Sequence, residues 1–97
     1  MKGSEVAKIR ARVIVEGQVQ GVYFRSYILE KAKKLNLTGF VRNLVDGRVE
    51  IVIEGKRDDV KTLVDWCHKG PPSARVSEVK VDWEEYSGRH HSFSVRY

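Results

Sequence analysis

The chain is organised around one stretch that joins a strand pattern to a helix pattern: Gly17-Gln18-Val19-Gln20-Gly21-Val22-Tyr23-Phe24-Arg25. The first turn of a helix has backbone N–H groups without intrahelical partners, which Ser, Thr, Asp or Asn at the cap usually satisfies. None of these residue types occurs in this stretch. It contains instead two glycines, which permit unusual backbone angles and a close ligand approach, and an arginine. Open donors beside a positive charge favour the binding of phosphate.

Length and composition restrict the class of protein. A chain of 97 residues forms one domain with a single two-layer core, in which we interpret residues 1–8 as an N-terminal extension. No run of about 18 apolar residues is present, and residues 1–8 contain no apolar segment typical of a signal peptide. We therefore expect a cytoplasmic protein without membrane contact. The lone Cys67 excludes an internal disulfide, and no Cys/His spacing resembles a metal site.

Charge and amide content give two further indications. The formal net charge of +5 favours anionic partners, which charge alone leaves open between small phosphates and nucleic acid. Charged residues make up 32% of the chain, which has only two asparagines and two glutamines, a bias typical of thermophiles. The few amides are therefore informative. Asn43 is the one without an evident structural reason.

Apolar residues that alternate or recur at helical spacing predict five strands and two helices. A two-residue hairpin turn, Asp46-Gly47, precedes the third strand, Gly55 ends that strand, and Asn36 ends the first helix in a left-handed conformation. Cys67 falls on the apolar stripe of the second helix, which indicates a core residue and not a nucleophile. The predicted strands cover 9–16, 39–45, 48–54, 79–84 and a short segment from 93, and the predicted helices cover 24–35 and 58–69.

The third predicted strand has one apolar side. Its residues Val49, Ile51 and Ile53 alternate with Glu50 and Glu54, which predicts one buried face and one solvent-facing face. The complete order is βαββαβ with a terminal strand. This order predicts an α+β, ferredoxin-like sandwich, in which a mainly antiparallel sheet carries both helices on one face.

This topology brings two polar residues to the same edge of the sheet. A strand–helix–strand unit returns its second strand parallel to the first, so the loop before Arg25 and the end of the strand with Asn43 share an edge. The third strand lies between them, which places their backbones roughly 10 Å apart. We expect both side chains to converge on one small ligand.

The converging groups contain no conventional acid or base, so the reaction must be one with a good leaving group. Hydrolysis of an acyl phosphate fits, because the released carboxylate needs no proton. Arg25 is expected to bind the phosphoryl oxygens bidentately, and Asn43 to orient the attacking water. Loop N–H groups share the remaining charge. The predicted phosphate-binding residues are Gln18, Val19, Gln20, Gly21, Val22, Tyr23 and Phe24.

Two further motifs accompany the opening stretch. They are Gly39-Phe40-Val41-Arg42-Asn43, followed by Asp46-Gly47-Arg48-Val49-Glu50, and Gly70-Pro71-Pro72-Ser73-Ala74-Arg75-Val76. Together they resemble the signature of the acylphosphatase family from about residue 10 to the C-terminus. The resemblance implies a small stand-alone acylphosphatase that hydrolyses acyl phosphates to a carboxylate and orthophosphate without a cofactor or metal. It assigns phosphate binding to Arg25 and water orientation to Asn43. Inorganic phosphate is then expected to compete as the product, and the enzyme to be a monomer.

The same residues also fit simpler interpretations. Arg25 alone fits a surface arginine paired with a glutamate, Asn43 fits a turn residue, and Tyr23 fits loop packing. A ferredoxin-like sheet in a basic protein also suggests RNA binding, but the first and third strands carry no aromatic residue, so nucleic acid is not the expected partner. A dependent acylphosphatase-like domain of a larger carbamoyl-transferring maturation protein is the other alternative.

Overall fold

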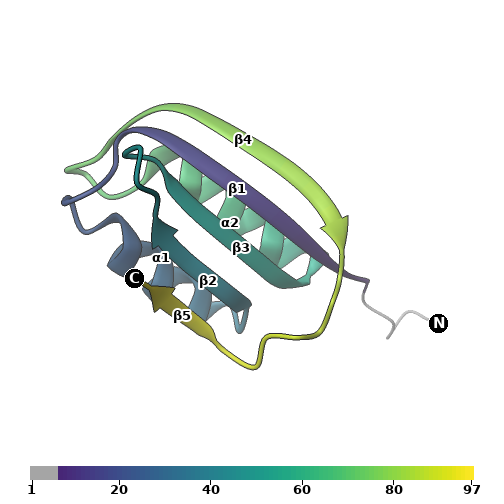
Figure 1. Ribbon diagram of the computed structural model, residues 1–97. Helices are drawn as coiled ribbons and strands as arrows, with labels where there is room; N and C mark the ends of the chain where they lie inside the picture. The colour runs from purple at the N-terminus through teal and green to yellow at the C-terminus, as the bar shows by residue number, and fades with distance from the viewer. Residues whose placement is uncertain (1–6) are drawn as a thin grey trace.

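The predicted βαββαβ order with an added fifth strand is present in the computed structural model, which describes residues 7–97 (Figure 1). Most of the predicted N-terminal extension lies outside the described residues, and Lys8 already belongs to the first strand. The elements are β1 (Lys8–Gln18), α1 (Phe24–Lys34), β2 (Thr38–Asn43), β3 (Val49–Lys56), α2 (Arg57–Lys69), β4 (Arg75–Glu85) and β5 (Phe93–Arg96).

The five strands form one sheet in the order β4-β1-β3-β2-β5. All neighbours are antiparallel except β2 and β5, which are parallel. Figure 1 shows both helices behind the same face of this sheet. The ferredoxin-like prediction is therefore confirmed, including the position of β3 between β1 and β2. As a consequence, the end of β1, the start of α1 and the end of β2 lie at one edge.

The core fills the space between the sheet and the helices. The fully buried Val13 and Ile51 from the sheet belong to one hydrophobic cluster with Ile28 of α1 and Leu63 of α2. Each such side chain contributes about 1.5–3 kcal/mol through the area removed from water. Cys67 is fully buried in the same cluster, and burial raises the pKa of its thiol to about 12. The prediction that Cys67 is a core residue is confirmed.

Two glycine positions differ from the sequence prediction. The hairpin between β2 and β3 is a three-residue loop, Val45 to Gly47, and not a two-residue turn, because only Gly47 has a positive φ, 96°. The N–H of Gly47 donates to the carbonyl of Leu44, as in a turn followed by a glycine bulge. Gly55 does not end β3, which continues to Lys56. An added Cβ on Gly55 would lie 2.5 Å from Leu37, so this glycine permits a close approach.

The first helix ends as predicted. Asn36 has φ 56°, the left-handed conformation that terminates a helix, and Lys31, Lys33 and Lys34 occupy the last turn, where the helix dipole favours positive charge. The chain then returns as β2 toward the edge of the sheet that carries the start of α1.

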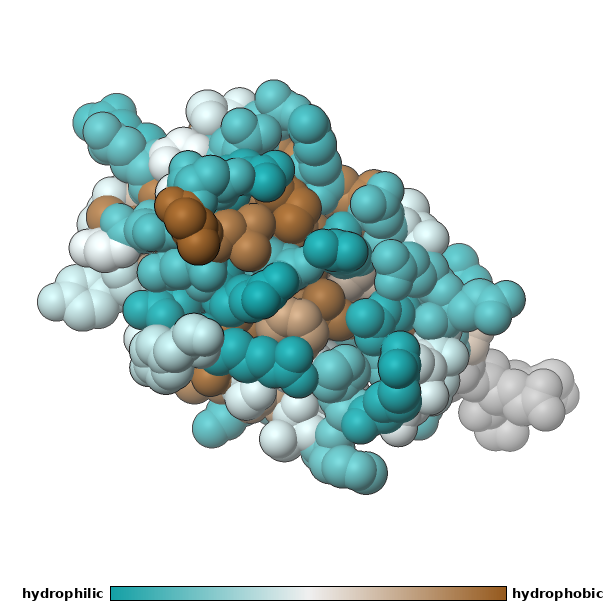
Figure 2. All heavy atoms as spheres, viewed as in Figure 1, coloured by the Kyte–Doolittle hydropathy of each residue, from teal (hydrophilic) through white to brown (hydrophobic). Residues whose placement is uncertain are grey.

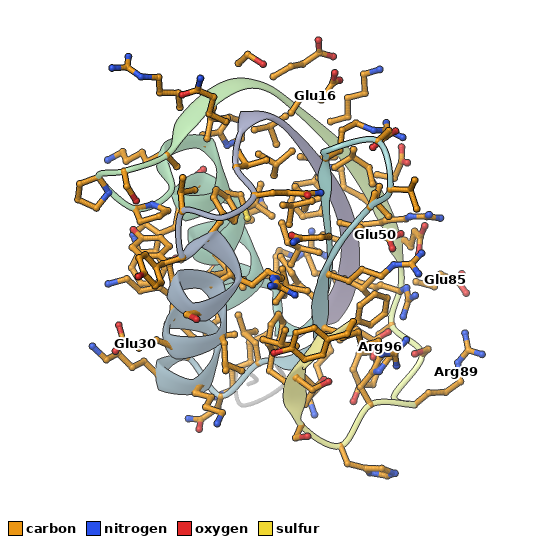
Figure 3. All side chains as sticks on the ribbon, turned by 60° about the vertical axis from the view of Figure 1, so that its left-hand side comes forward. Glu16, Glu30, Glu50, Glu85, Arg89 and Arg96 are labelled. Atoms are coloured by element: carbon orange, nitrogen blue, oxygen red, sulfur yellow. The ribbon has the colours of Figure 1, made fainter. Side chains whose placement is uncertain are left out.

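The helix-free face of β3 is also buried, which the sequence analysis did not predict. Glu50 is 2% exposed and Glu54 is 0% exposed. Glu50 accepts from Arg12 at 2.6 Å and from Arg42 at 2.5 Å, so two neighbouring arginines cover and neutralise it. Figure 3 shows Glu50 and Arg96 on the side of the sheet away from the helices. Figure 2 shows that this face is mainly hydrophilic, because long charged side chains lie over it.

Glu54 fixes the connection between β4 and β5 across this face. Its carboxylate accepts from the Ser87 N–H at 2.9 Å, the Ser87 hydroxyl at 2.6 Å, the Gly88 N–H at 3.1 Å and Arg10 at 3.0 Å. Burial by itself would raise the pKa of Glu54, but the hydrogen bonds from Ser87, Arg10 and Gly88 outweigh it and lower the pKa. The ionised form therefore stabilises the folded protein.

We expect the stability contribution of Glu54 to depend on pH. Since its folded pKa is below the ordinary value of a glutamate, the contribution is complete above that ordinary value and is lost as pH falls through the folded pKa. Glu54→Gln should lower the free energy of unfolding by about 2 kcal/mol or more near neutral pH. This difference should shrink in acid, as measured by urea unfolding. Glu84→Gln, a control at the exposed partner of Arg10, should cost less than about 1 kcal/mol. Equal costs for both variants would contradict the assignment.

Candidate active site

The start of α1 has the open donors that the sequence predicted. Its N-cap position is Tyr23, which makes no side-chain cap hydrogen bond, and the first turn contains no acidic residue. Tyr23 has φ 63° and ψ 21°, a left-handed conformation that costs a non-glycine residue about 1–2 kcal/mol. A helix start that is strained, uncapped and without a carboxylate is a ready site for an anionic ligand.

Hydrogen bonds hold the connecting loop, residues 19–23, from two sides. The amide nitrogen of Gln20 donates to the carbonyls of Leu44 at 2.7 Å and Arg48 at 2.9 Å, which ties the loop to the β2–β3 hairpin. On the other side, the hydroxyl of Ser73 donates to the carbonyl of Val22 at 2.9 Å. The side chains of Val19 and Phe24, each 1% exposed, anchor the ends of the loop in the core. The loop is therefore fixed before any ligand binds.

A cavity of about 280 Å³ opens at this point between α1 and the end of β2. Arg25 and Asn43 both line it, so the predicted convergence of these two residues is present. Of the predicted loop residues, four line the cavity, whereas Gln18, Gln20 and Val22 do not. The complete lining is Val19, Gly21, Tyr23, Phe24, Arg25, Ser26 and Asn43.

Ser26 is a cavity residue that the sequence analysis did not single out. It follows Arg25 in the first turn of α1, where its N–H belongs to the donors without an intrahelical partner. Its position directly after Arg25 is the one sequence feature that could have indicated a place in the site. The cavity therefore offers a hydroxyl in addition to the backbone donors.

The guanidinium of Arg25 is available to a ligand. Within residues 7–97 no carboxylate lies within salt-bridge distance of it, which does not support the interpretation as a surface ion pair. Its Cζ lies 4.9 Å from the centre of the Tyr97 ring. Such a cation–π contact restricts the side chain without neutralising its charge.

The side chain of Asn43 has an unusual environment. Asn43 is the last residue of β2 and pairs with Val49 across the hairpin. Among the residues that the structure describes, its Oδ1 is buried without a hydrogen-bond partner. A buried unpaired acceptor costs about 1–3 kcal/mol, which is a reason to look for a ligand or water at this atom. The Asn43 side chain does not close the turn, since the Leu44 N–H to Arg48 carbonyl bond does so.

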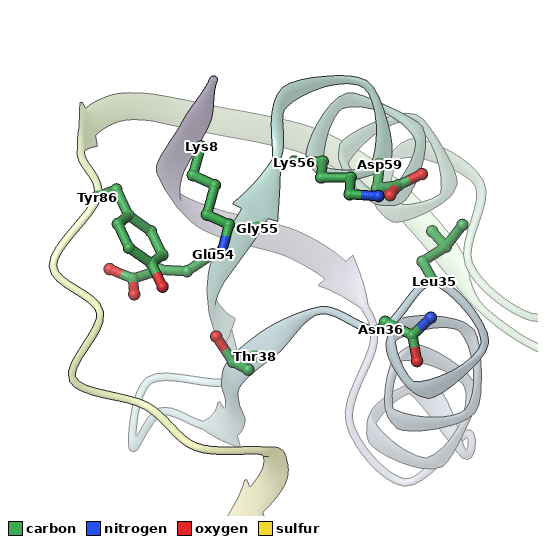
Figure 4. Close-up of a pocket in the computed structure, with 9 residues that line it drawn as sticks. All are labelled: Lys8, Leu35, Asn36, Thr38, Glu54, Gly55, Lys56, Asp59 and Tyr86. Carbon is green, nitrogen blue, oxygen red and sulfur yellow. The ribbon is translucent and has the colours of Figure 1, made fainter. Parts of the chain in front are cut away.

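A second cavity, of about 170 Å³, lies at the opposite end of the sheet (Figure 4). Two lysines, Lys8 and Lys56, and two carboxylates, Glu54 and Asp59, are among the residues that line it. Lys56 stands at the uncapped start of α2, but the first turn of α2 carries the carboxylates of Asp58 and Asp59, and Asp59 lines the cavity. It does not share the features of the cavity at Arg25.

Between residues 7 and 97 there is no group of three or more His, Cys, Asp or Glu side chains arranged to hold a metal ion. In the same part of the chain no helix is long and apolar enough to cross a membrane.

Comparisons with known proteins agree with this geometry. The acylphosphatase family model matches residues 11–95. The chain is 48% identical to an acylphosphatase from Pelotomaculum thermopropionicum over 95% of this chain and 100% of that protein. It superposes on the crystal structure of the Bacillus subtilis acylphosphatase with a TM-score of 0.88 and 38% identity, covering 92% of this chain and 99% of that one. It also resembles part of full-length HypF in a phosphate- and nucleotide-bound form, with a TM-score of 0.84 and 25% identity, covering 99% of this chain and 13% of that one.

We expect Gln20 to hold the loop and the hairpin of Asn43 in register. Gln20→Leu keeps a similar volume but removes the donor to two carbonyls, so it should lower the free energy of unfolding by about 1–3 kcal/mol. It should also reduce catalytic efficiency about tenfold or more, because small displacements of positioned groups are costly. Urea unfolding and steady-state kinetics measure these effects. Gln18→Leu, at an exposed neighbouring amide, should change stability by less than about 0.5 kcal/mol. A Gln20 variant as stable and active as the unmodified protein would contradict this role.

Proposed function

The chain belongs to the acylphosphatase family and hydrolyses acyl phosphates, and we propose that the cavity between α1 and β2 is its active site. The observation that carries this proposal is the convergence of an unpaired arginine, an uncapped helix start and an unpartnered buried amide oxygen on one cavity. Each of these features is costly or unusual in isolation. Together they provide what acyl phosphate hydrolysis requires, which is donors for the phosphoryl oxygens and a group that positions water.

The first step is the binding of the phosphoryl group. Arg25 donates two N–H groups to phosphoryl oxygens, a pairing for which the planar guanidinium is suited. The open N–H groups at the start of α1, from the loop through Ser26, bind the remaining oxygens. The fixed loop means that these donors need little reorganisation as charge develops in the transition state.

The second step is attack by water. The amide of Asn43 orients the water in line with the bond from phosphorus to the acyl oxygen. The buried Oδ1 without a partner supports this role, since an acceptor in this position gains a hydrogen bond from the water. In phosphoryl transfer, positioning and charge stabilisation provide most of the catalysis.

The leaving group explains why the reaction needs no general acid in the cavity. In the part of the chain that the structure describes, no His, Cys, Asp, Glu or Lys lines it. Cleavage of the bond between phosphorus and the acyl oxygen releases a carboxylate, which carries its negative charge without protonation. Water supplies the oxygen and protons of the orthophosphate. The residues present are therefore sufficient for an acyl phosphate and poorly suited to a phosphate ester with an alkoxide leaving group.

The proposal also covers the oligomeric state, the location and the substrate of the enzyme. The enzyme acts as a monomer. The buried free thiol of Cys67 is compatible with the reducing cytoplasm, the location that we propose. The substrate is a small acyl phosphate, and nucleic acid is not proposed as a partner.

We expect the purified protein to hydrolyse acetyl and benzoyl phosphate in the presence of a chelator at the same rate as without it. Arg25→Ala and Asn43→Ala should each lower catalytic efficiency by roughly 10²–10³-fold, the usual loss for a preorganised donor. Arg25→Lys should recover little, since lysine cannot bind bidentately. Release of orthophosphate measures all of these rates.

Matched control variants test whether the loss of activity depends on the position of the arginine and the asparagine in the cavity and not on their residue type. Arg57 also lies in the first turn of a helix but is exposed in α2, and Asn36 is the other asparagine of the chain. Arg57→Ala and Asn36→Gly should leave activity within about twofold. Near-normal turnover in an Arg25 or Asn43 variant, or inactivation by the chelator, would refute the mechanism.

Inorganic phosphate should be a competitive inhibitor, because the product occupies the same donors. It should also raise the melting temperature, since it binds the folded state alone. Both effects should be lost in Arg25→Ala and kept in Arg57→Ala. An absence of inhibition at high phosphate concentration would show that the loop does not bind this anion.

A further inference from the structure

Large apolar side chains are exposed at the mouth of the cavity. Tyr23 is 81% exposed although it lines the cavity, and Tyr97 is fully exposed although its ring contacts Arg25. The interpretation of Tyr23 as a loop-packing residue is therefore wrong. Exposed aromatic rings beside a polar cavity are typical of a ligand-binding rim.

The reaction geometry indicates which part of the substrate reaches this rim. In an in-line displacement the leaving group lies on the opposite side of the phosphorus from the attacking water. Asn43, which holds the water, is the one lining residue from β2, and all the others belong to residues 19–26. The acyl group must therefore extend along the side formed by the loop and the start of α1. Tyr23 is the exposed large apolar residue on that side.

The charges on this side do not suit an anionic acyl group. Among residues 7–97, Arg25 is the one cationic residue that lines the cavity, and the phosphoryl group occupies its guanidinium. A second carboxylate or phosphate on the acyl group would have no partner there. An apolar acyl group, in contrast, removes exposed ring surface from water.

On the basis of the proposed function, we propose that the rings of Tyr23 and Tyr97 form the acyl-binding surface and that the enzyme prefers acyl phosphates with extended apolar or aromatic acyl groups. The strained backbone of Tyr23 fits this role. A tyrosine in the left-handed conformation has no advantage for the fold, where glycine or asparagine would cost less.

The unmodified protein provides the first test. Acetyl, butyryl and hexanoyl phosphate have leaving groups of nearly equal basicity, so their intrinsic reactivity is similar. Catalytic efficiency should rise several-fold from acetyl to hexanoyl phosphate and should fall for succinyl phosphate, which carries a second carboxylate. A flat or falling series would overturn the inference while leaving the proposed function intact. A protein that hydrolyses none of these compounds would refute both.

Variants identify the residues responsible. The measured quantity is the ratio of catalytic efficiency for hexanoyl phosphate to that for acetyl phosphate, because effects on the phosphoryl site act on both substrates and cancel. Tyr23→Asn retains a residue that tolerates the left-handed backbone and should lower the ratio about fivefold. Tyr23→Gly should do the same, whereas Tyr23→Phe should preserve the ratio. Tyr97→Ser should lower the ratio as well, even if loss of its contact with Arg25 slows both reactions.

Two exposed apolar residues elsewhere serve as controls. Val45 lies two residues after Asn43 on the water side, and Trp83 lies on β4. Val45→Ser and Trp83→Ser should leave the ratio within about twofold. An unchanged ratio in both Tyr23→Asn and Tyr23→Gly would overturn the assignment of Tyr23. A ratio that falls equally in the Trp83 control would also overturn it.

Discussion

The left-handed backbone of Tyr23 at the start of α1 is the constraint on which the site depends. It turns the chain from the sheet into the helix without a capping side chain, and so leaves the first N–H groups of the helix directed at a cavity. A strained residue persists only when its surroundings determine its conformation. Here Gln20 and Ser73 bind the loop from opposite sides, and Phe24 anchors its end in the core.

The rest of the fold forms the scaffold that holds this open site in place. The hydrophobic cluster holds α1 and α2 on the sheet, and two buried glutamates hold the helix-free face together. Glu50 joins Arg12 and Arg42 from the strands on either side of β3, while Glu54 fixes the connection to β5. Polar groups in this scaffold are paired. In the cavity, by contrast, Arg25 has no carboxylate partner and Asn43 Oδ1 accepts no hydrogen bond from residues 7–97. This contrast between satisfied and open polar groups distinguishes the site from its support.

Sequence patterns predicted the fold and two central site residues, but failed where non-local contacts decide the outcome. The alternation in β3 indicated one solvent-facing side, yet Glu50 and Glu54 are buried, because arginines from neighbouring strands and the segment after β4 cover them. Asp46-Gly47 indicated a two-residue turn, whereas the positive φ is confined to Gly47 and the loop includes Val45. Ser26 and the exposure of Tyr23 depend on the three-dimensional shape of the cavity, which no local pattern encodes.

The sequence by itself determined the order of the elements, the absence of a cap before α1, the edge at which Arg25 and Asn43 meet, and the family resemblance. These properties follow from local periodicity, residue chemistry and the handedness of strand–helix–strand units. Only the tertiary structure decided which polar groups have hydrogen-bond partners and which do not. Such pairing depends on how close segments far apart in the sequence come to one another, as in the hydrogen bonds from Gln20 to the hairpin and from Ser73 to the loop. For the same reason, the tertiary structure alone placed Tyr23 in the lining of the cavity and the ring of Tyr97 against Arg25, where the acyl group is proposed to bind.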